Sequence, residues 1–379
     1  MDRRQLIKNC AASSALFVGQ GLWSSMRNSR PVAASPISSR LPKNAATDPR
    51  LPARLQAAQD LVNSETKTAV AQGLRFLKSR QVISGDFTGA FGNNGYASGP
   101  AVTALAGLAF MCSGSTPFDG PYASHIRKCT QFLLAHTSAK GYIASPGNRR
   151  SNMYGHGYGM LFLSQVYGMS GSPAVEATLR RAVTMTCNVQ NEKGGWRYQP
   201  TKQEGDLSIT ICQIMALRAA HDAGMSVSAE VRDRTLDYVY KSQKKDGSFQ
   251  YMLRGGRVSL ALTAAGVVSL YSAGVYDGEP VEKALKWIFA RRPRKGLVSS
   301  EVSSMNYYYA HYYAVQAMWH AQIQHPEYWN QWYPAVRDQL LKRATRGVWD
   351  DPRVCPEFAT AMACIILQIP FNYLPVFTP

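Results

Sequence analysis

The side chains that could do chemistry gather at the starts of apolar, helix-forming stretches. One group combines basic, amide, phenol and imidazole side chains: Arg150, Asn152, Tyr154, His156 and Tyr158. A second group repeats the amide, phenol and imidazole types: Asn306, Tyr308, His311 and Tyr312. Phenols and imidazoles transfer protons, while amides and guanidinium groups stabilise oxyanions. These residue types predict either acid–base chemistry or the binding of a polar ligand.

The first group suggests one specific reaction. Tyr154 or His156 would remove the proton beside a uronate carboxylate, and Asn152 and Arg150 would neutralise that carboxylate, as in β-elimination by a polysaccharide lyase. The alternative is that these rings line the inside of the fold, where they pack and hydrogen-bond at once. We take Tyr154, His156 and Asp206 as catalytic candidates. The other members of both groups are substrate-binding candidates.

Asp206 stands at the start of a third apolar stretch, shortly after Glu204. Its simplest role is to cap that helix by accepting a backbone N–H. The following Leu207-Ser208 lacks the thiolate that a zinc site would need, and no two cysteines have CxxC spacing. We therefore expect no metal and no cofactor. The six cysteines after Cys10 are predicted to be buried free thiols.

The elements that position these residues come from a repeated unit of about 50 residues. A turn of the form Q-x-x-x-G-x-aromatic begins at Gln81, Gln190 and Gln243. Degenerate copies begin at His136, Arg291 and Arg343. The turn glycines are nearly evenly spaced: Gly85, Gly141, Gly194, Gly247, Gly296 and Gly347.

Each unit pairs a helix that carries charge on one face with a helix that is apolar on nearly all faces. The apolar helices are expected at 98–113, 156–170, 207–223, 258–273, 305–321 and 356–368. Four of them end at a glycine suited to a left-handed cap: Gly114, Gly171, Gly224 and Gly274. Helix pairs of this size bury their apolar faces only by stacking, and six pairs can close on themselves. We predict an all-α fold, an (α/α)6 toroid over 62–379, with an open helical superhelix as the alternative.

The turn from Gln190 to Trp196 matches in full the Q-x-x-x-G-x-W turn of squalene and oxidosqualene cyclases. With the apolar helices, it makes the chain resemble the prenyltransferase and squalene-oxidase repeat group, the α/α toroids of terpenoid cyclases and protein prenyltransferases. The resemblance covers about 62–379. It implies a ring whose central cavity binds a ligand near the starts of the inner helices.

The chemical motifs of that group are missing. The sequence has no DxDD acid motif of hopene-type cyclases, no Asp-x-Cys zinc pair of protein prenyltransferases and no GCGEQ thioester motif. The resemblance therefore implies a toroid that binds a ligand without the standard cyclase or zinc chemistry. The lyase, acting on an anionic uronate polymer, is one alternative. An isoprenoid-modifying enzyme with a divergent site, whose aromatic residues stabilise carbocations, is the other.

The N-terminus predicts export. Arg3-Arg4-Gln5-Leu6-Ile7-Lys8 resembles a twin-arginine signal, so we expect a signal peptide over 1–34, a flexible linker over 35–61 and a periplasmic or extracellular protein. The alternative is that the N-terminal segment stays uncleaved as a membrane anchor. Beyond the signal no segment is apolar enough to span a membrane. The net charge is +18, and the excess persists after the signal is set aside. It suits a polyanion, while the scattered basic residues do not indicate nucleic acid. The expected ligand is a small molecule, glycan or lipid.

Overall fold

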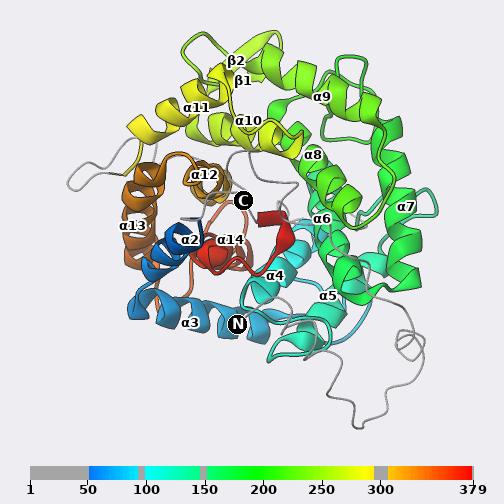
Figure 1. The fold of residues 1–379 in the computed structure, drawn as a ribbon. Coiled ribbons are helices and arrows are strands. Elements are labelled where there is room, and N and C mark those ends of the chain that lie inside the picture. Colours follow the sequence, from blue (N-terminus) through cyan, green and yellow to red (C-terminus); the bar gives the residue numbers. More distant parts are fainter. Residues whose placement is uncertain (1–50, 93–98, 146–151, 294–305, 378–379) are drawn as a thin grey trace.

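The computed structural model describes residues 51–377 except 93–98, 146–151 and 294–305. Within these residues, outer and inner helices alternate along the chain around a ring (Figure 1). The outer helices are α3 (Ser64–Arg80), α5 (Ala123–Ala135), α7 (Pro173–Asn188), α9 (Ala229–Ser242), α11 (Glu279–Ala290) and α13 (Pro326–Arg343). The inner helices are α4 (Gly99–Cys112), α6 (Asn152–Ser170), α8 (Leu207–Asp222), α10 (Leu260–Ser272), α12 (Tyr307–Ala321) and α14 (Pro356–Gln368).

The inner helices form the core because they are apolar around their whole circumference. Every residue of α4 is buried, as is every residue of α10 except Ser272. The outer helices are amphipathic, and in α11 Leu285 and Ile288 are buried while Lys283 and Lys286 are exposed. This division follows from the charge pattern, since a helix that exposes one face keeps its charges there.

The repeated turns lock each helix pair to the next. The buried Gln190 amide donates to Gly194 O at 3.0 Å in its own turn and to Val231 O at 2.9 Å in the next outer helix. Gln243 does the same, donating to Gly247 O at 3.2 Å and to Pro280 O at 2.8 Å. The motif glutamine therefore ties its own turn to the backbone of the next outer helix.

The ring is closed. Inner helix α14 packs against α3 and α4 of the first repeat, and a Cβ added to Gly347 would lie 2.2 Å from Gln72 Cβ in α3. The last turn thus contacts the first outer helix, as the turns at Gly141, Gly194 and Gly247 contact the outer helices that follow them. The predicted toroid is confirmed, and the open superhelix is wrong.

Some elements differ from the sequence prediction. The linker predicted over 35–61 contains α2 (Leu51–Asp60), whose Ala58 is buried and whose Arg54 Nη1 donates to Ile323 O at 3.1 Å. A hairpin, β1 (Gln250–Met252) and β2 (Gly255–Val258), precedes α10. After α14 the chain continues through η3 (Ile369–Phe371) and η4 (Pro375–Phe377).

The described part of the chain contains no helix long and apolar enough to cross a bilayer. The predicted signal peptide over 1–34 and the first part of the predicted linker lie outside the described residues. The six cysteines of the described part are free, and only Cys187 is partly exposed. The predicted free thiols are therefore confirmed for these residues, and their predicted burial is confirmed for all but Cys187.

Candidate functional site

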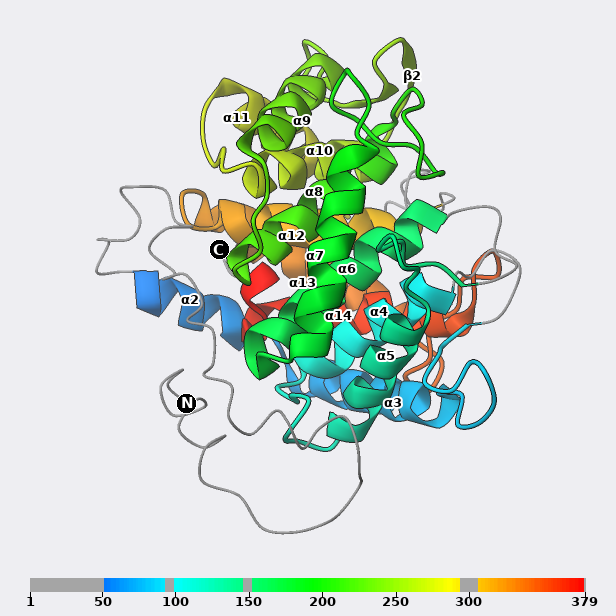
Figure 2. The ribbon, with the colours of Figure 1, turned by 90° about the vertical axis from the view of Figure 1, so that its right-hand side faces the viewer.

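The ring has two chemically different ends. The starts of α6, α8 and α12 meet at one end through Tyr154, Ser208 and Tyr309. The C-terminal ends of α8, α10 and α12 meet at the other, through Asp222, Ser272 and His320. The β-hairpin lies at the first end, and α2 and the C-terminal segment lie at the second (Figure 2).

Asp206 organises the first end. Its side chain is fully buried and caps α8 by accepting from Ile209 N at 3.0 Å. Ser208 Oγ donates to the same oxygen, Oδ1, at 2.5 Å. Arg197 Nη1 donates to the other oxygen, Oδ2, at 3.0 Å. Burial raises the pKa of Asp206 above its ordinary value, and these hydrogen bonds oppose that rise.

Two tyrosines join this network through Ser208. Tyr154 OH donates to Ser208 Oγ at 2.9 Å, and Tyr309 OH donates to Ser208 O at 2.9 Å. Burial, with Asp206 adding a like-charge effect, raises the pKa of Tyr154 well above its ordinary value. Tyr154 is therefore held as a neutral hydrogen-bond donor.

Arg197 is also bracketed by aromatic rings. Its guanidinium carbon lies 4.9 Å from the centre of the Tyr198 ring and 5.7 Å from that of Tyr251. The two phenols hydrogen-bond to each other at 2.6 Å. The exposed Arg257 lies over the Tyr251 ring at 5.9 Å. Cation–π contact holds the guanidinium group in place between rings and carboxylate.

We use the name mouth basin for the cluster of partly exposed and buried side chains that share these contacts, and not for a cavity: Tyr154, Arg197, Tyr198, Asp206, Tyr251 and Tyr309. They come from α6, α8, α12, β1 and the loop after the third repeat turn. The basin therefore combines phenol hydroxyls, aromatic faces and an arginine backed by a buried acid.

A layer of tyrosines closes the ring beneath the basin. Inner helices α6 and α12 are opposite each other in the ring, since contacts link the inner helices in the order α4, α6, α8, α10, α12, α14 and back to α4. Across the centre, Tyr158 OH and Tyr313 OH are 3.2 Å apart, and Tyr158 packs edge-on against Tyr312 at 6.0 Å. Cys212 Sγ contacts Tyr313 OH at 3.2 Å. We call Tyr158, Tyr312 and Tyr313 the tyrosine floor.

The two predicted histidines lie away from the basin. His156 is fully buried, and its Nδ1 accepts from Ile143 N at 3.2 Å while Nε2 lies 2.7 Å from Thr186 Oγ1 on outer helix α7. His311 is buried between Tyr307 and Trp332. Burial lowers the pKa of each to about 3. Neither His156 nor His311 is placed to act as a general base on a ligand, because both rings are packed between helices.

The other predicted site residues lie in different parts of the structure. Tyr154, Tyr158, Tyr312 and Asp206 lie in the basin or the floor. Tyr308 is buried beside Tyr307, away from both, and burial raises its pKa to about 12. Asn306 precedes α12 without a side-chain capping bond. Arg150 and the side chain of Asn152 lie outside the described residues.

The sequence analysis missed the arginine and most of the aromatic residues of the basin. Arg197 and Tyr198 follow Trp196 of the one fully matching turn, so their position next to that motif was the available signal. Tyr251 lies on an unexpected hairpin, and Ser208 was considered only as a substitute for a thiolate. Among the described residues, no group of three or more His, Cys, Asp and Glu side chains could hold a metal ion.

This architecture defines an α/α toroid protein with a closed ring and a polar mouth. Residues 159–303 match the family model described as the prenyltransferase alpha-alpha toroid domain, which confirms the resemblance found in the sequence. A comparison with curated proteins finds no sequence match.

Solved toroid structures are similar in fold. Cellobiose 2-epimerase from Spirochaeta thermophila has a TM-score of 0.60 at 11% identity, covering 86% of this chain and 99% of that one. A type II terpene cyclase from Scytonema has 0.55 at 16%, covering 82% and 100%. An inactive α-1,6-mannanase variant from Salegentibacter, in complex with α-1,6-mannotriose, has 0.55 at 8%, covering 80% and 98%. At these identities the similarity establishes the fold alone.

Proposed function

We propose that this protein binds a saccharide with acidic groups in the mouth basin, outside the cytoplasm, and is a binding protein rather than a cyclase or zinc prenyltransferase. The observation that carries the proposal is the basin itself, where Arg197 is fixed by Asp206 between the rings of Tyr198 and Tyr251. Sugar C–H faces pack on aromatic rings, and sugar hydroxyls pair with phenols. Arginine pairs with carboxylates.

The electrostatics around the basin support an acidic ligand. Arg254 and Arg257 are exposed on the hairpin. Within the described part of the chain, only Arg254 of these two has an ion pair, with Glu204 at 3.4 Å. Exposed basic residues at the rim attract an anionic chain and raise its rate of association. The excess of basic residues that remains without the predicted signal peptide acts in the same direction.

The tyrosine floor weighs against an isoprenoid substrate. A long apolar chain needs a deep apolar cavity, whereas rings from α6 and α12 meet across the described centre of the ring. Asp206 is also poorly placed to protonate an alkene, because both of its oxygens already have donors. Two of the similar toroids are described with saccharides, cellobiose and α-1,6-mannotriose, which supports the saccharide proposal.

The uronate lyase gains no support from the geometry. Tyr154 donates to Ser208 and its raised pKa makes it a poor base at neutral pH. His156 is packed between helices α6 and α7. An acidic saccharide would therefore be bound in the basin and released intact.

Calorimetric titration of the full chain tests this proposal. An oligogalacturonate should bind more tightly than cellotriose, and a geranylgeranyl compound should not bind. Tyr251→Ala should weaken saccharide binding by about tenfold, since it removes a stacking surface. The control is Tyr240→Ala, an exposed tyrosine on outer helix α9, which should bind as the wild type does.

Arg257→Ser separates charge from stacking. It should reduce the preference for oligogalacturonate over cellotriose while leaving cellotriose binding unchanged. Tight binding of the isoprenoid without any saccharide binding would refute the proposal. An increase in absorbance from an unsaturated uronate product would show that the protein is a lyase and not a binding protein.

A further inference from the structure

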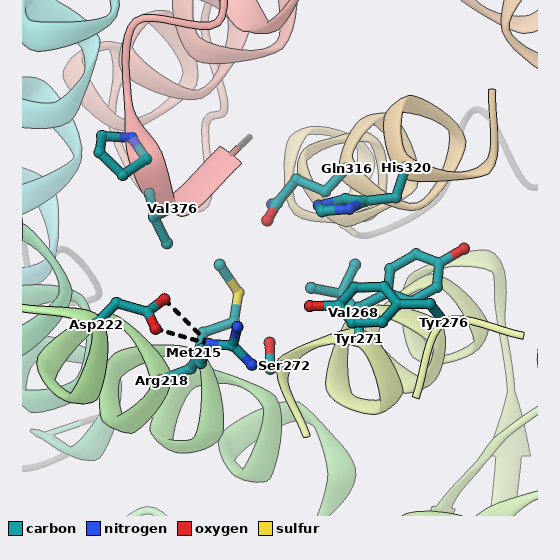
Figure 3. Close-up of a pocket in the computed structure, with 11 residues that line it drawn as sticks. Met215, Arg218, Asp222, Val268, Tyr271, Ser272, Tyr276, Gln316, His320 and Val376 are labelled. Atoms are coloured by element: carbon teal, nitrogen blue, oxygen red, sulfur yellow. Dashed lines mark hydrogen bonds and ion pairs between the residues drawn. The ribbon is translucent and has the colours of Figure 1, made fainter. Parts of the chain in front are cut away.

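A pocket opens at the end of the ring opposite the mouth basin (Figure 3). The C-terminal ends of α8, α10 and α12 form three of its walls, and the C-terminal segment supplies a fourth through Pro375 and Val376. The volume that a water-sized sphere can reach in the pocket is about 40 Å³, and the pocket is partly open to solvent. It therefore suits a small ligand and not a polymer.

Arg218 is the charged group of this pocket. Its Nε donates to both oxygens of Asp222, one turn later on α8, at 3.1 and 3.0 Å. Because the carboxylate holds the guanidinium by its Nε edge, the terminal amino groups extend past it toward the interior (Figure 3). The side chain is only 25% exposed. The guanidinium group also hydrogen-bonds with the Tyr276 side chain, so its remaining terminal N–H groups are the donors that could contact an oxyanion.

The facing wall is aromatic. Tyr271 and Tyr276 are stacked, with ring centres 5.6 Å apart at 16°, and His320 lies 5.0 Å from Tyr271. Burial raises the pKa of Tyr271, so its phenol stays neutral. Gln316 points its amide oxygen into the space between the walls (Figure 3). Met215 and Val268 add apolar surface.

We propose that this pocket binds a small organic oxyanion, a carboxylate or phosphate on a compact body, through the guanidinium of Arg218. The charged group would lie against the terminal amino groups of Arg218, and the body would pack on the aromatic wall and Val376. A cation is disfavoured because Arg218 already occupies both oxygens of Asp222. The site is independent of the mouth basin, since the tyrosine floor lies between them.

Saturable stabilisation of the full chain by small anions tests the proposal. Inorganic phosphate, acetate and benzoate are titrated separately while the thermal unfolding midpoint is recorded, with sodium chloride at equal ionic strength as the reference. At least one probe should raise the midpoint along a saturating curve beyond the chloride effect. A larger rise of the midpoint with benzoate than with acetate would identify the aromatic wall as part of the site. A larger rise with phosphate than with either would identify a phosphate ligand.

Three variants locate the site. Arg218→Gln should abolish the saturable shift. Asp222→Asn should tighten binding by about fivefold, because it removes a competing negative charge from the same guanidinium. Arg180→Gln, which breaks the comparable ion pair with Glu176 on outer helix α7, should bind as the wild type does.

The variants act in opposite directions, so a folding defect does not imitate the expected pattern. The proposal is overturned if the wild type responds to all three probes no more than to chloride. It is equally overturned if Arg218→Gln keeps the saturable shift, or if Asp222→Asn weakens it.

Discussion

At the scale of single residues, this protein uses ionisable groups for packing where the sequence suggested chemistry. His156 and His311 lie on opposite inner helices, and burial lowers the pKa of both to about 3. Each is neutral in the folded protein at neutral pH, while the unfolded chain would protonate a histidine near pH 6.5. Their burial makes the stability of the ring depend on acidity.

Replacing His311 with phenylalanine should reduce that dependence. The unfolded state takes up the proton first, so the stability is full above about pH 6.5 and is lost as the pH falls toward 3. The free energy of unfolding of His311→Phe, relative to that of the wild type, should therefore rise by about 1.4 kcal/mol for each pH unit below 6.5. Urea unfolding at pH 7.5, 6 and 5 measures this difference.

The control for that series is His221→Gln, since the His221 side chain is 62% exposed. It should follow the wild-type pH dependence. An unchanged gap between His311→Phe and the wild type at pH 7.5 and pH 5 would contradict the buried, neutral histidine.

The candidate site could be predicted only in part, for a reason that lies in its contacts. Asp206 was recognisable because a helix cap is a local feature, set by the residues that follow it. Arg197 is nine residues earlier, and the hairpin residue Tyr251 belongs to the next repeat. Their convergence depends on how the loops fold over the inner helices, which no helical periodicity encodes.

At the scale of elements, the turn glycines join neighbouring repeats. A Cβ added to Gly194 would lie 2.0 Å from Arg234 O, and one added to Gly141 would lie 2.3 Å from Arg181 O. Both have a positive φ of 89°. In the first repeat, Gly89 makes this contact with Lys128 O, and the predicted turn residue Gly85 has nothing within 4 Å.

Gly194 and Gly85 therefore form a matched pair for mutation. Gly194→Ala should destabilise the protein by about 3 kcal/mol or more, because it adds a collision with backbone to the strain of a positive φ. Gly85→Ala should cost about 1 kcal/mol, from strain alone. Chemical denaturation of both variants measures the difference, and equal losses would show that the glycine does not set the spacing between repeats.

The helices themselves were largely predictable from the sequence. The apolar stretch expected at 207–223 is α8, and the one expected at 356–368 is α14. The repeat supplied these boundaries, because turns and caps recur at fixed places in it. Elements outside the repeat were missed: α2 was assigned to a linker rich in Pro, Ala and Arg, and its order comes from contacts with α13 and η3.

At the scale of the whole molecule, the C-terminal segment seals one end of the ring. Phe377 is 2% exposed and packs edge-on against Tyr312 of the tyrosine floor, with ring centres 6.1 Å apart. Leu374 is 1% exposed. The chain end thus contributes to the core of a domain whose helices precede it.

Phe377→Ala should lower the free energy of unfolding by about 3 kcal/mol, since it empties a buried site next to the floor. Tyr373→Ala, four residues earlier and 47% exposed, should cost less than about 1 kcal/mol. Thermal and urea unfolding of both variants measure the effect. A small loss in the free energy of unfolding of Phe377→Ala would mean that the C-terminal segment contributes little to the stability of the ring.

The seating of Gly347 on α3 also sets an order of events during synthesis. Helix α3 leaves the ribosome first among the repeats and α14 last, yet each needs the other to cover its apolar face. The ring therefore closes only after α14 has been synthesised, and the early repeats wait until then with apolar surface exposed. An export route that accepts a finished, folded protein would protect such a chain. A route that threads it during synthesis would deliver an open ring.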